Sequence, residues 1–335
     1  DKNLIEKVIR ALSLLEMRVK AGCPLVFKGG TALMLILGKS AHRLSIDIDL
    51  ICPPGTNIED YLKSFADFGF INLELVERKQ RDDADIPKSH SKFFYQIAYR
   101  NDTDAQSYIL LDVLYEDIHY FRTQQIAINC PFIRLEGKPL MVTVPSAEDI
   151  LGDKLTAFAP NTTGIPYYRN GRSCSMEIAK QLYDVGRLFE NVSDLQITKE
   201  AFRKIAVVEL SYRSFGTDIG QVFNDIRQTA LCISTRGKAG EGDFDLIQDG
   251  IIRVKSFMYK QRYLIDHAII DAARAAYLAT LIEKGINEIE SYSNTPADIK
   301  DMVIRPSLPN KLNKLRSNLP EAYYYWAKTS ELLEA

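Results

Sequence analysis

The chain has few of the residues that build disulfide frameworks and zinc sites. Its 335 residues include five cysteines and four histidines, widely spaced and without a CxxC pair. An odd, scattered set of cysteines indicates reduced thiols, and the histidines lack zinc-site spacing. No apolar run approaches the roughly 18–20 residues that span a bilayer, and the N-terminal segment has no secretory pattern. We therefore expect a cytoplasmic protein with no membrane partner.

An excess of charge of either sign is also missing. The 42 Lys and Arg residues face 44 Asp and Glu residues, which gives a formal net charge of −2. This balance neither requires nor excludes a nucleic-acid partner, because a basic face can exist locally. Apolar residues make up 46% of the chain, which is enough for one large domain or two ordinary ones.

The periodicity of apolar residues changes character near residue 145. Before it, helical patterns over 2–21, 31–37 and 57–68 alternate with strand-like runs over 25–27, 44–52, 70–78, 92–100, 107–115, 125–133 and 140–144. After it, helices are expected over 146–158, 174–190, 198–211, 217–233, 245–286 (interrupted) and 320–333, with loops over 160–173, 234–243 and 293–310. The predicted fold class is α+β, with a mixed-sheet domain over 1–145 and a mostly helical domain over 146–335.

One strand-like segment, LSIDIDL over 44–50, alternates strictly between apolar and polar residues. In a strand this alternation places Asp47 and Asp49 on one face, about 6–7 Å apart. A divalent ion between them removes their repulsion, and carboxylates with phosphate oxygens suit Mg²⁺. Taken alone, the tripeptide is equally compatible with the exposed polar face of an edge strand.

Two neighbouring features favour the metal interpretation. Gly29, Gly30 and Thr31 stand at a strand-to-helix turn, where backbone amides of a helix N-terminus attract phosphate. An ordinary tight turn is the alternative. Asp112 lies inside the apolar run 108–115, where a carboxylate is costly unless it is paired, metal-bound or facing solvent. In the functional interpretation, Asp112 accepts a proton from an attacking hydroxyl or is a third metal ligand.

These residues resemble a known family. The stretches KGGTAL over 28–33 and RLSIDID over 43–49 are similar to the first motif of the AbiEii-type nucleotidyltransferase toxins, within the DNA polymerase β-like nucleotidyltransferase superfamily. GDKLTAF over 152–158 resembles the family's lysine motif, and KQLYDVGRL over 180–188 resembles its third motif. Without the resemblance, Lys154 is also compatible with a lysine that extends to solvent, and Asp184 with a surface pair to Arg187 or Lys180.

The resemblance implies a toxin of a bacterial type IV toxin–antitoxin or phage abortive-infection system. By it, Lys154 and Asp184 join Asp47, Asp49 and Asp112 as catalytic residues, and the helical domain completes the active-site cleft. The metal ligands for Mg²⁺ or Mn²⁺ are expected to be Asp47, Asp49 and Asp112. The expected nucleoside triphosphate contacts are Lys28, Gly29, Gly30, Thr31, Ser45 and Lys154.

The expected reaction transfers a nucleotide to the 3′ end of tRNA, which inhibits translation, in a monomer with a cognate antitoxin as partner. Possible RNA contacts are a basic cluster (Lys311, Lys314 and Arg316), the loop 167–172 and the aromatic run 323–326. The aromatic run is also typical of a helix that docks on the core. A transferase acting on a protein or small-molecule hydroxyl, and a catalytically silent nucleotide-binding protein, are the alternatives.

Overall fold

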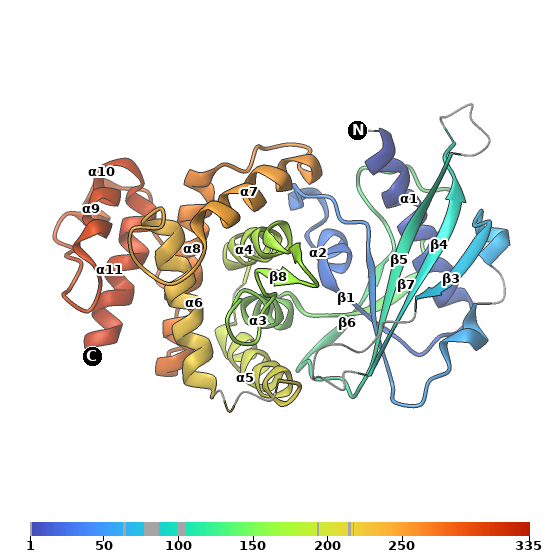
Figure 1. The fold of residues 1–335 in the computed structure, drawn as a ribbon, viewed down its shortest axis with the longest axis horizontal. Coiled ribbons are helices and arrows are strands. Elements are labelled where there is room, and N and C mark those ends of the chain that lie inside the picture. Colours follow the sequence, from blue (N-terminus) through green and yellow to red (C-terminus); the bar gives the residue numbers. More distant parts are fainter. Residues whose placement is uncertain are drawn as a thin grey trace. The chain divides into compact units, whose positions relative to one another are not determined.

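The computed structural model describes residues 2–62, 65–76, 87–98, 105–192, 194–213, 216 and 218–335. The chain divides into two compact units. The sheet unit is Asp1–Ser146 with Phe257–Gln261, and the helical unit is Ala147–Ser256 with Arg262–Ala335. In Figure 1 the strands are concentrated in the first unit and the helices in the second. The mixed α+β fold class is therefore confirmed.

The sheet unit is built on a five-stranded mixed sheet with strand order β1-β2-β5-β4-β3. The strands are β1 (Val26–Lys28), β2 (Ile48–Cys52), β3 (Asn72–Val76), β4 (Lys88–Gln96) and β5 (Gln106–Tyr115). β2 and β5 run parallel, and the other neighbouring pairs are antiparallel. β6 (Thr123–Ala127) and β7 (Met141–Pro145) form a separate antiparallel ribbon.

Helix α1 (Lys2–Lys20) lies along one face of this sheet (Figure 1). Its buried residues Val8 and Leu15 belong to the same apolar core as Ile48, Leu50 and Leu111 of the strands. Because successive strand residues point to opposite faces, burying Ile48 and Leu50 against this core turns Asp49 to the other face. Packing on one side of the sheet thus determines which side carries the carboxylates.

A segment far along the chain completes the sheet unit. Leu44 donates its backbone N–H to the carbonyl of Phe257 at 2.9 Å, and Arg43 forms a β-bridge with Met258. Helix α2 (Gly29–Leu37) follows β1 directly, and the 3₁₀ turn Gly38–Ser40 ends it. The residues just before β2 are therefore held by main-chain bonds from a distant segment.

The helical unit is organised around α8 (Ile265–Lys284), which is buried on nearly all sides by α4, α6 and α11. Small residues such as Ala272 and Ala276 let these neighbours approach closely. The other elements of this unit are α3 (Ala147–Ala157), the hairpin β8 (Tyr168–Arg169) and β9 (Arg172–Ser173), α4 (Ser175–Phe189), α5 (Leu195–Ser211), α6 (Ile219–Ser234), α7 (Phe244–Val254), α9 (Pro296–Ile299), α10 (Leu315–Asn318) and α11 (Pro320–Glu334). Among the described residues, no helix combines the length and apolar character needed to traverse a bilayer.

The aromatic run near the C-terminus is part of the core of the helical unit. Tyr323, Tyr325 and Trp326 on α11 are all buried, and the Trp326 indole N–H donates to Ser234 Oγ at 2.9 Å. The expectation of a helix docking on the core is confirmed, and the alternative that these rings stack on RNA bases is wrong because they are enclosed.

Several predicted elements have different bounds. The run over 44–52 is a strand only from Ile48, and the described residues of the expected helix over 57–68 form two 3₁₀ turns, Ile58–Tyr61 and Phe65–Phe68. The run over 125–133 ends as a strand at Ala127, and 245–286 divides into α7, the 3₁₀ turn Lys255–Phe257 and α8. The expected loops over 160–173 and 293–310 contain the β8–β9 hairpin and α9. Residues 63–64, 77–78, 99–100 and 217 of the predicted elements lie outside the described residues.

Candidate active site

Four polar residues stand in one row across the sheet. Lys28 on β1 is the register partner of Asp49 on β2, Asp49 of Asp112 on β5, and Asp112 of His90 on β4. Residues directly opposite on neighbouring strands share a face, and such strands are about 4.8 Å apart. The two predicted acids are therefore immediate neighbours, although 63 positions separate Asp49 from Asp112 in sequence.

Gly29 brings the main chain against the Asp49 carboxylate. Its φ is +79°, a conformation that favours glycine, and a Cβ placed on it would lie 2.1 Å from Asp49 Oδ2. Gly30 is enclosed in the same way, because its Cβ would lie 2.8 Å from Ser45 Oγ and 3.0 Å from Arg43 Nη2. Both glycines thus make room for polar side chains that approach the turn.

Thr31 and Asp47 are connected through the main chain. The Thr31 hydroxyl is fully buried and donates to the backbone carbonyl of Asp47 at 2.7 Å. Asp47 precedes the first residue of β2, so the prediction that both acids lie within the strand is wrong for Asp47. The physical reason is that bonds to α2 and to the 257–258 segment hold residues 43–47 in place of sheet pairing. The predicted phosphate contact of Thr31 stays a prediction.

The N-terminus of α2 has the features of an anion site. Lys28 occupies the N-cap position, no side chain of the described residues caps the helix, and its first turn contains no acidic residue. The first backbone N–H groups of a helix lack intrahelical acceptors and carry partial positive charge. A phosphate placed here would receive these N–H groups next to the Asp49 and Asp112 row.

The row fits a divalent cation in part. Carboxylate oxygens are the donors that Mg²⁺ prefers, and Asp49 and Asp112 stand side by side. Within the described part of the chain, however, no three His, Cys, Asp or Glu side chains converge well enough to hold one ion. The three-carboxylate set of Asp47, Asp49 and Asp112 therefore stays a prediction, with the neighbouring pair as its structural basis.

The predicted residues of the helical unit form a buried ion pair. Lys154 Nζ on α3 lies 3.1 Å from Asp184 Oδ2 on α4 and donates to Gln181 Oε1 at 2.9 Å. The two charged side chains are 8% and 2% exposed. This burial rules out a lysine that extends to solvent. Arg187, considered as a partner for Asp184, pairs with Glu190 and Asp271.

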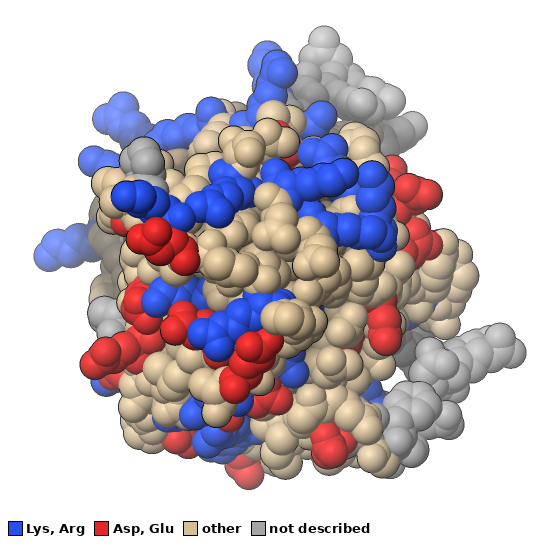
Figure 2. Space-filling view, turned by 90° about the vertical axis from the view of Figure 1, so that its left-hand side faces the viewer, with Lys and Arg blue, Asp and Glu red and all other residues tan. Residues whose placement is uncertain are grey.

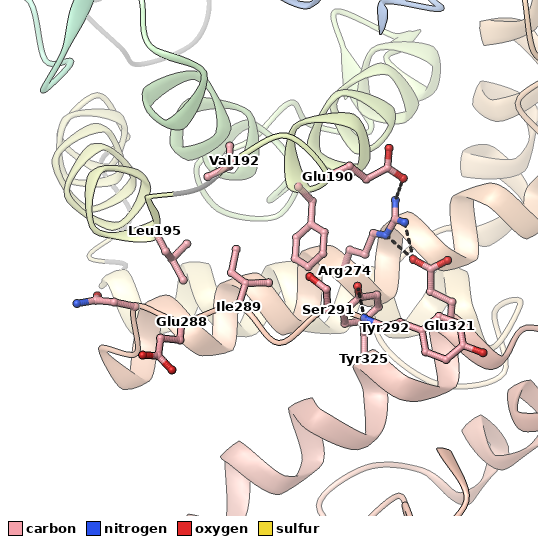
Figure 3. Close-up of a pocket in the computed structure, with 12 residues that line it drawn as sticks. Glu190, Val192, Leu195, Arg274, Glu288, Ile289, Ser291, Tyr292, Glu321 and Tyr325 are labelled. Atoms are coloured by element: carbon pink, nitrogen blue, oxygen red, sulfur yellow. Dashed lines mark hydrogen bonds and ion pairs between the residues drawn. The ribbon is translucent and has the colours of Figure 1, made fainter. Parts of the chain in front are cut away.

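A cavity of about 620 Å³ lies elsewhere in the helical unit. Figure 3 shows Arg274 in its wall between Glu190 and Glu321, with Tyr325 nearby. The guanidinium also bonds the fully buried Asp271, and burial raises the pKa of Asp271 to about 6 against the pull of Arg187 and Arg274. With every nearby cation engaged by carboxylates, this network is a structural feature of the core.

Sequence reasoning missed His90 and Gln181. His90 precedes the predicted strand 92–100, whereas β4 begins at Lys88, and extending the alternation back by two residues would have placed His90 on the strand. Gln181 is one position from Lys180 in the third motif, and only the helix packing shows that it accepts from Lys154.

The sheet with its acid row and adjacent glycine turn offers carboxylates and backbone N–H groups of the kinds that a nucleotidyltransferase uses. The chain belongs to the family described as nucleotidyl transferase AbiEii toxin, type IV TA system, whose sequence profile matches residues 11–297. The resemblance stated from the motifs is thereby confirmed.

Solved structures similar to this chain include two from bacteria. MenT4, a nucleotidyltransferase toxin from Mycobacterium tuberculosis, is 12% identical, with 97% of this chain and 92% of that chain covered and a TM-score of 0.47. JHP933 from Helicobacter pylori is 16% identical, with 85% and 90% covered and a TM-score of 0.39. A comparison with curated proteins finds no match.

Proposed function

We propose that this toxin transfers a nucleoside monophosphate from a nucleoside triphosphate to the 3′ end of tRNA and thereby inhibits translation. The observation that carries the chemistry is the register of Asp49 and Asp112 beside the uncapped N-terminus of α2. This arrangement offers carboxylates for a cation and N–H donors for phosphates, and transfer from a triphosphate needs both.

The proposed roles follow the positions of the residues. Asp47, Asp49 and Asp112 hold Mg²⁺ or Mn²⁺, which when bound neutralises charge on the triphosphate. The backbone N–H groups of Gly29 and Gly30 donate to phosphate oxygens, with Lys28, Thr31 and Ser45 around them. In the alternative role, Asp112 leaves the cation to Asp47 and Asp49 and accepts the proton of the attacking hydroxyl. The acceptor oxygen then bonds the α-phosphorus as the bond to the β-phosphate oxygen breaks, and pyrophosphate leaves.

Lys154 and Asp184 are proposed to serve the same reaction. Lys154 contributes positive charge to triphosphate binding, and Asp184 holds the lysine in place through the 3.1 Å contact. Gln181 fixes the other side of the ammonium group. This proposal rests on the family motifs, and the buried pair shows that the two motifs are coupled within the helical unit.

The RNA acceptor is supported by a basic surface on the helical unit. In Figure 2, Lys and Arg side chains form a band across the upper part of the face shown, with acidic side chains more numerous below. Exposed cations of this unit include Lys238, Lys300, Lys311, Lys314 and Arg316. Lys311 donates to the main-chain carbonyl of Lys238, and Arg316 to that of Lys300, so the side chains of Lys311 and Arg316 are each tied to a segment that carries a further exposed lysine. Clustered cations attract the phosphate backbone of a nucleic acid, and the affinity of such a surface for nucleic acid falls as the salt concentration rises.

The β8–β9 hairpin offers a further contact. Tyr168 is 57% exposed, and Arg169 and Arg172 beside it are exposed as well. An exposed ring is suited to stack on an unpaired base, and the exposed guanidinium groups of the same hairpin are suited to bind phosphate. We propose this hairpin as a contact for the single-stranded acceptor end.

The test is an incubation of the protein with each α-labelled nucleoside triphosphate, Mg²⁺ and total tRNA. We expect label in RNA, with one triphosphate preferred. Label on protein alone would replace tRNA by a protein hydroxyl as the acceptor. Failure of every triphosphate to label RNA, protein or a small molecule would support a silent nucleotide-binding protein instead. Addition of the cognate antitoxin is expected to suppress the labelling.

A further inference from the structure

His90 lies at the end of the acid row and contacts one of its carboxylates. It is the register partner of Asp112, and its Nδ1 is hydrogen-bonded to Asp112 Oδ1. His90 is 6% exposed, whereas the side chain of Asp112 is 31% exposed. The histidine therefore supports Asp112 from the enclosed side and leaves the carboxylate open on the other.

The second ring nitrogen indicates that stability alone does not explain this histidine. Among the described residues, no partner hydrogen-bonds Nε2 of His90, although the atom is shut off from solvent. A buried polar atom without a partner costs about 1–3 kcal/mol. A leucine of similar volume would avoid this cost. Among the described residues, the polar side-chain contact of His90 is with Asp112, so we look for its role there.

The hydrogen bond engages one oxygen of the carboxylate. A carboxylate accepts, so Nδ1 carries a proton and donates it to Oδ1. Without this donor, the carboxylate of Asp112 is free to rotate about its Cβ–Cγ bond. With it, Oδ1 is engaged by the ring and Oδ2 is the oxygen left for the reaction.

We propose that His90 is a positioning residue that orients Asp112 for nucleotidyl transfer. The inference rests on the proposed function, because it assigns Asp112 a role in that reaction. Groups that orient a ligating carboxylate typically change metal affinity or activity by about 10–100-fold when removed. His90 acts through Asp112 and contacts no reacting atom itself.

The experiment compares three variants at this position. His90→Leu removes the donor and keeps the volume. His90→Asn retains an N–H donor at the place of Nδ1, and His90→Gln moves it to the place of Nε2. Lys92→Met is the matched control, because Lys92 lies two residues along the same face of β4, where it pairs with exposed Glu74.

We expect His90→Leu to lower kcat by about 10–100-fold, with KM for the triphosphate changed by less than about twofold. His90→Asn recovers most of this loss, whereas His90→Gln is as slow as His90→Leu. The melting temperature of His90→Leu is not below that of wild type, because the unpaired nitrogen is gone. Lys92→Met behaves as wild type.

A second readout does not depend on activity. Titration of Mn²⁺ into the nucleotide-free protein, followed by the paramagnetic resonance of free Mn²⁺, is expected to show about 10-fold weaker binding in His90→Leu. Wild-type kcat and Mn²⁺ affinity in this variant would overturn the proposal, and so would equal losses in the Leu and Asn variants together with a lower melting temperature. If wild type transfers no nucleotide, the proposed function fails, and the Mn²⁺ comparison still decides the role of His90.

Discussion

The close approach of Gly29 to Asp49 makes Gly29→Ala the most informative single change. The added Cβ would lie 2.1 Å from Oδ2 and 2.8 Å from Cγ of Asp49. Ordinary contacts of such atoms are about 3.5 Å, so the carboxylate or the turn must move by about 1 Å. A displacement of this size in a reacting group costs about 100-fold in rate.

The backbone conformation adds a second penalty that has to be separated from the first. Gly29 has a φ of +79°, and alanine in this region costs about 1–2 kcal/mol. Gly55 provides the matched control, because its φ is +83° and a Cβ added there would have no atom within 4 Å. Gly55→Ala therefore has the same backbone penalty without the contact with Asp49.

We expect both variants to lose similar stability, a few degrees in melting temperature for a penalty of about 1–2 kcal/mol. Only Gly29→Ala should lose nucleotide transfer, by about 100-fold in kcat/KM, measured with labelled triphosphate at a temperature where both proteins are folded. Equal transfer rates in the two variants would refute the reasoning, because they would show that the position of the Asp49 carboxylate does not matter.

Three further predictions concern charged groups in the cores of the two units. Lys154→Met or Asp184→Leu leaves the other charge buried, and each should lower the free energy of unfolding in urea by about 3–5 kcal/mol. The double variant should lose less than the sum of the two single losses, and simple additivity would argue against the pair. Burial raises the pKa of Asp271 from 3.8 to about 6, so its stabilising contribution is full below pH 3.8 and is lost as pH rises through 6. The stability of wild type relative to Asp271→Asn should thus fall by about 3 kcal/mol between pH 4 and 7, and a pH-independent difference would contradict this. Arg18 is fully buried, and its three side-chain nitrogens lack hydrogen-bond partners among the described residues. Arg18→Met should therefore leave the free energy of unfolding unchanged or raise it by about 1 kcal/mol. A loss above about 2 kcal/mol would assign the guanidinium a stabilising role.

The local patterns in the sequence predict the parts of the fold that local packing decides. The long helix α1 and the strand β5 follow directly from apolar spacing. In the segment 57–68, Ile58 and Leu62 are buried while Phe65 and Phe68 are only partly so, and the apolar spacing does not show that its described residues form 3₁₀ turns.

The candidate site depends on contacts that no local pattern contains. The motifs point to Asp49, Asp184 and Lys154, and the apolar run 108–115 points to Asp112, each residue by itself. The strand order makes Asp49 and Asp112 neighbours, and the packing of α3 on α4 pairs Lys154 with Asp184. His90 enters the row through the register of β4 with β5, and the Asp112 that its ring contacts lies 22 positions away.

The central claim is that the Asp49 and Asp112 row carries nucleotidyl transfer. It is tested most directly by presenting wild type and Asp49→Asn with the preferred triphosphate labelled at the α- or the γ-phosphorus, together with Mg²⁺ and tRNA. The account predicts that wild type moves the α-label into RNA and releases the γ-label as pyrophosphate, and that folded Asp49→Asn does neither. Transfer of the γ-label to the acceptor, or undiminished transfer of the α-label by Asp49→Asn, would contradict it.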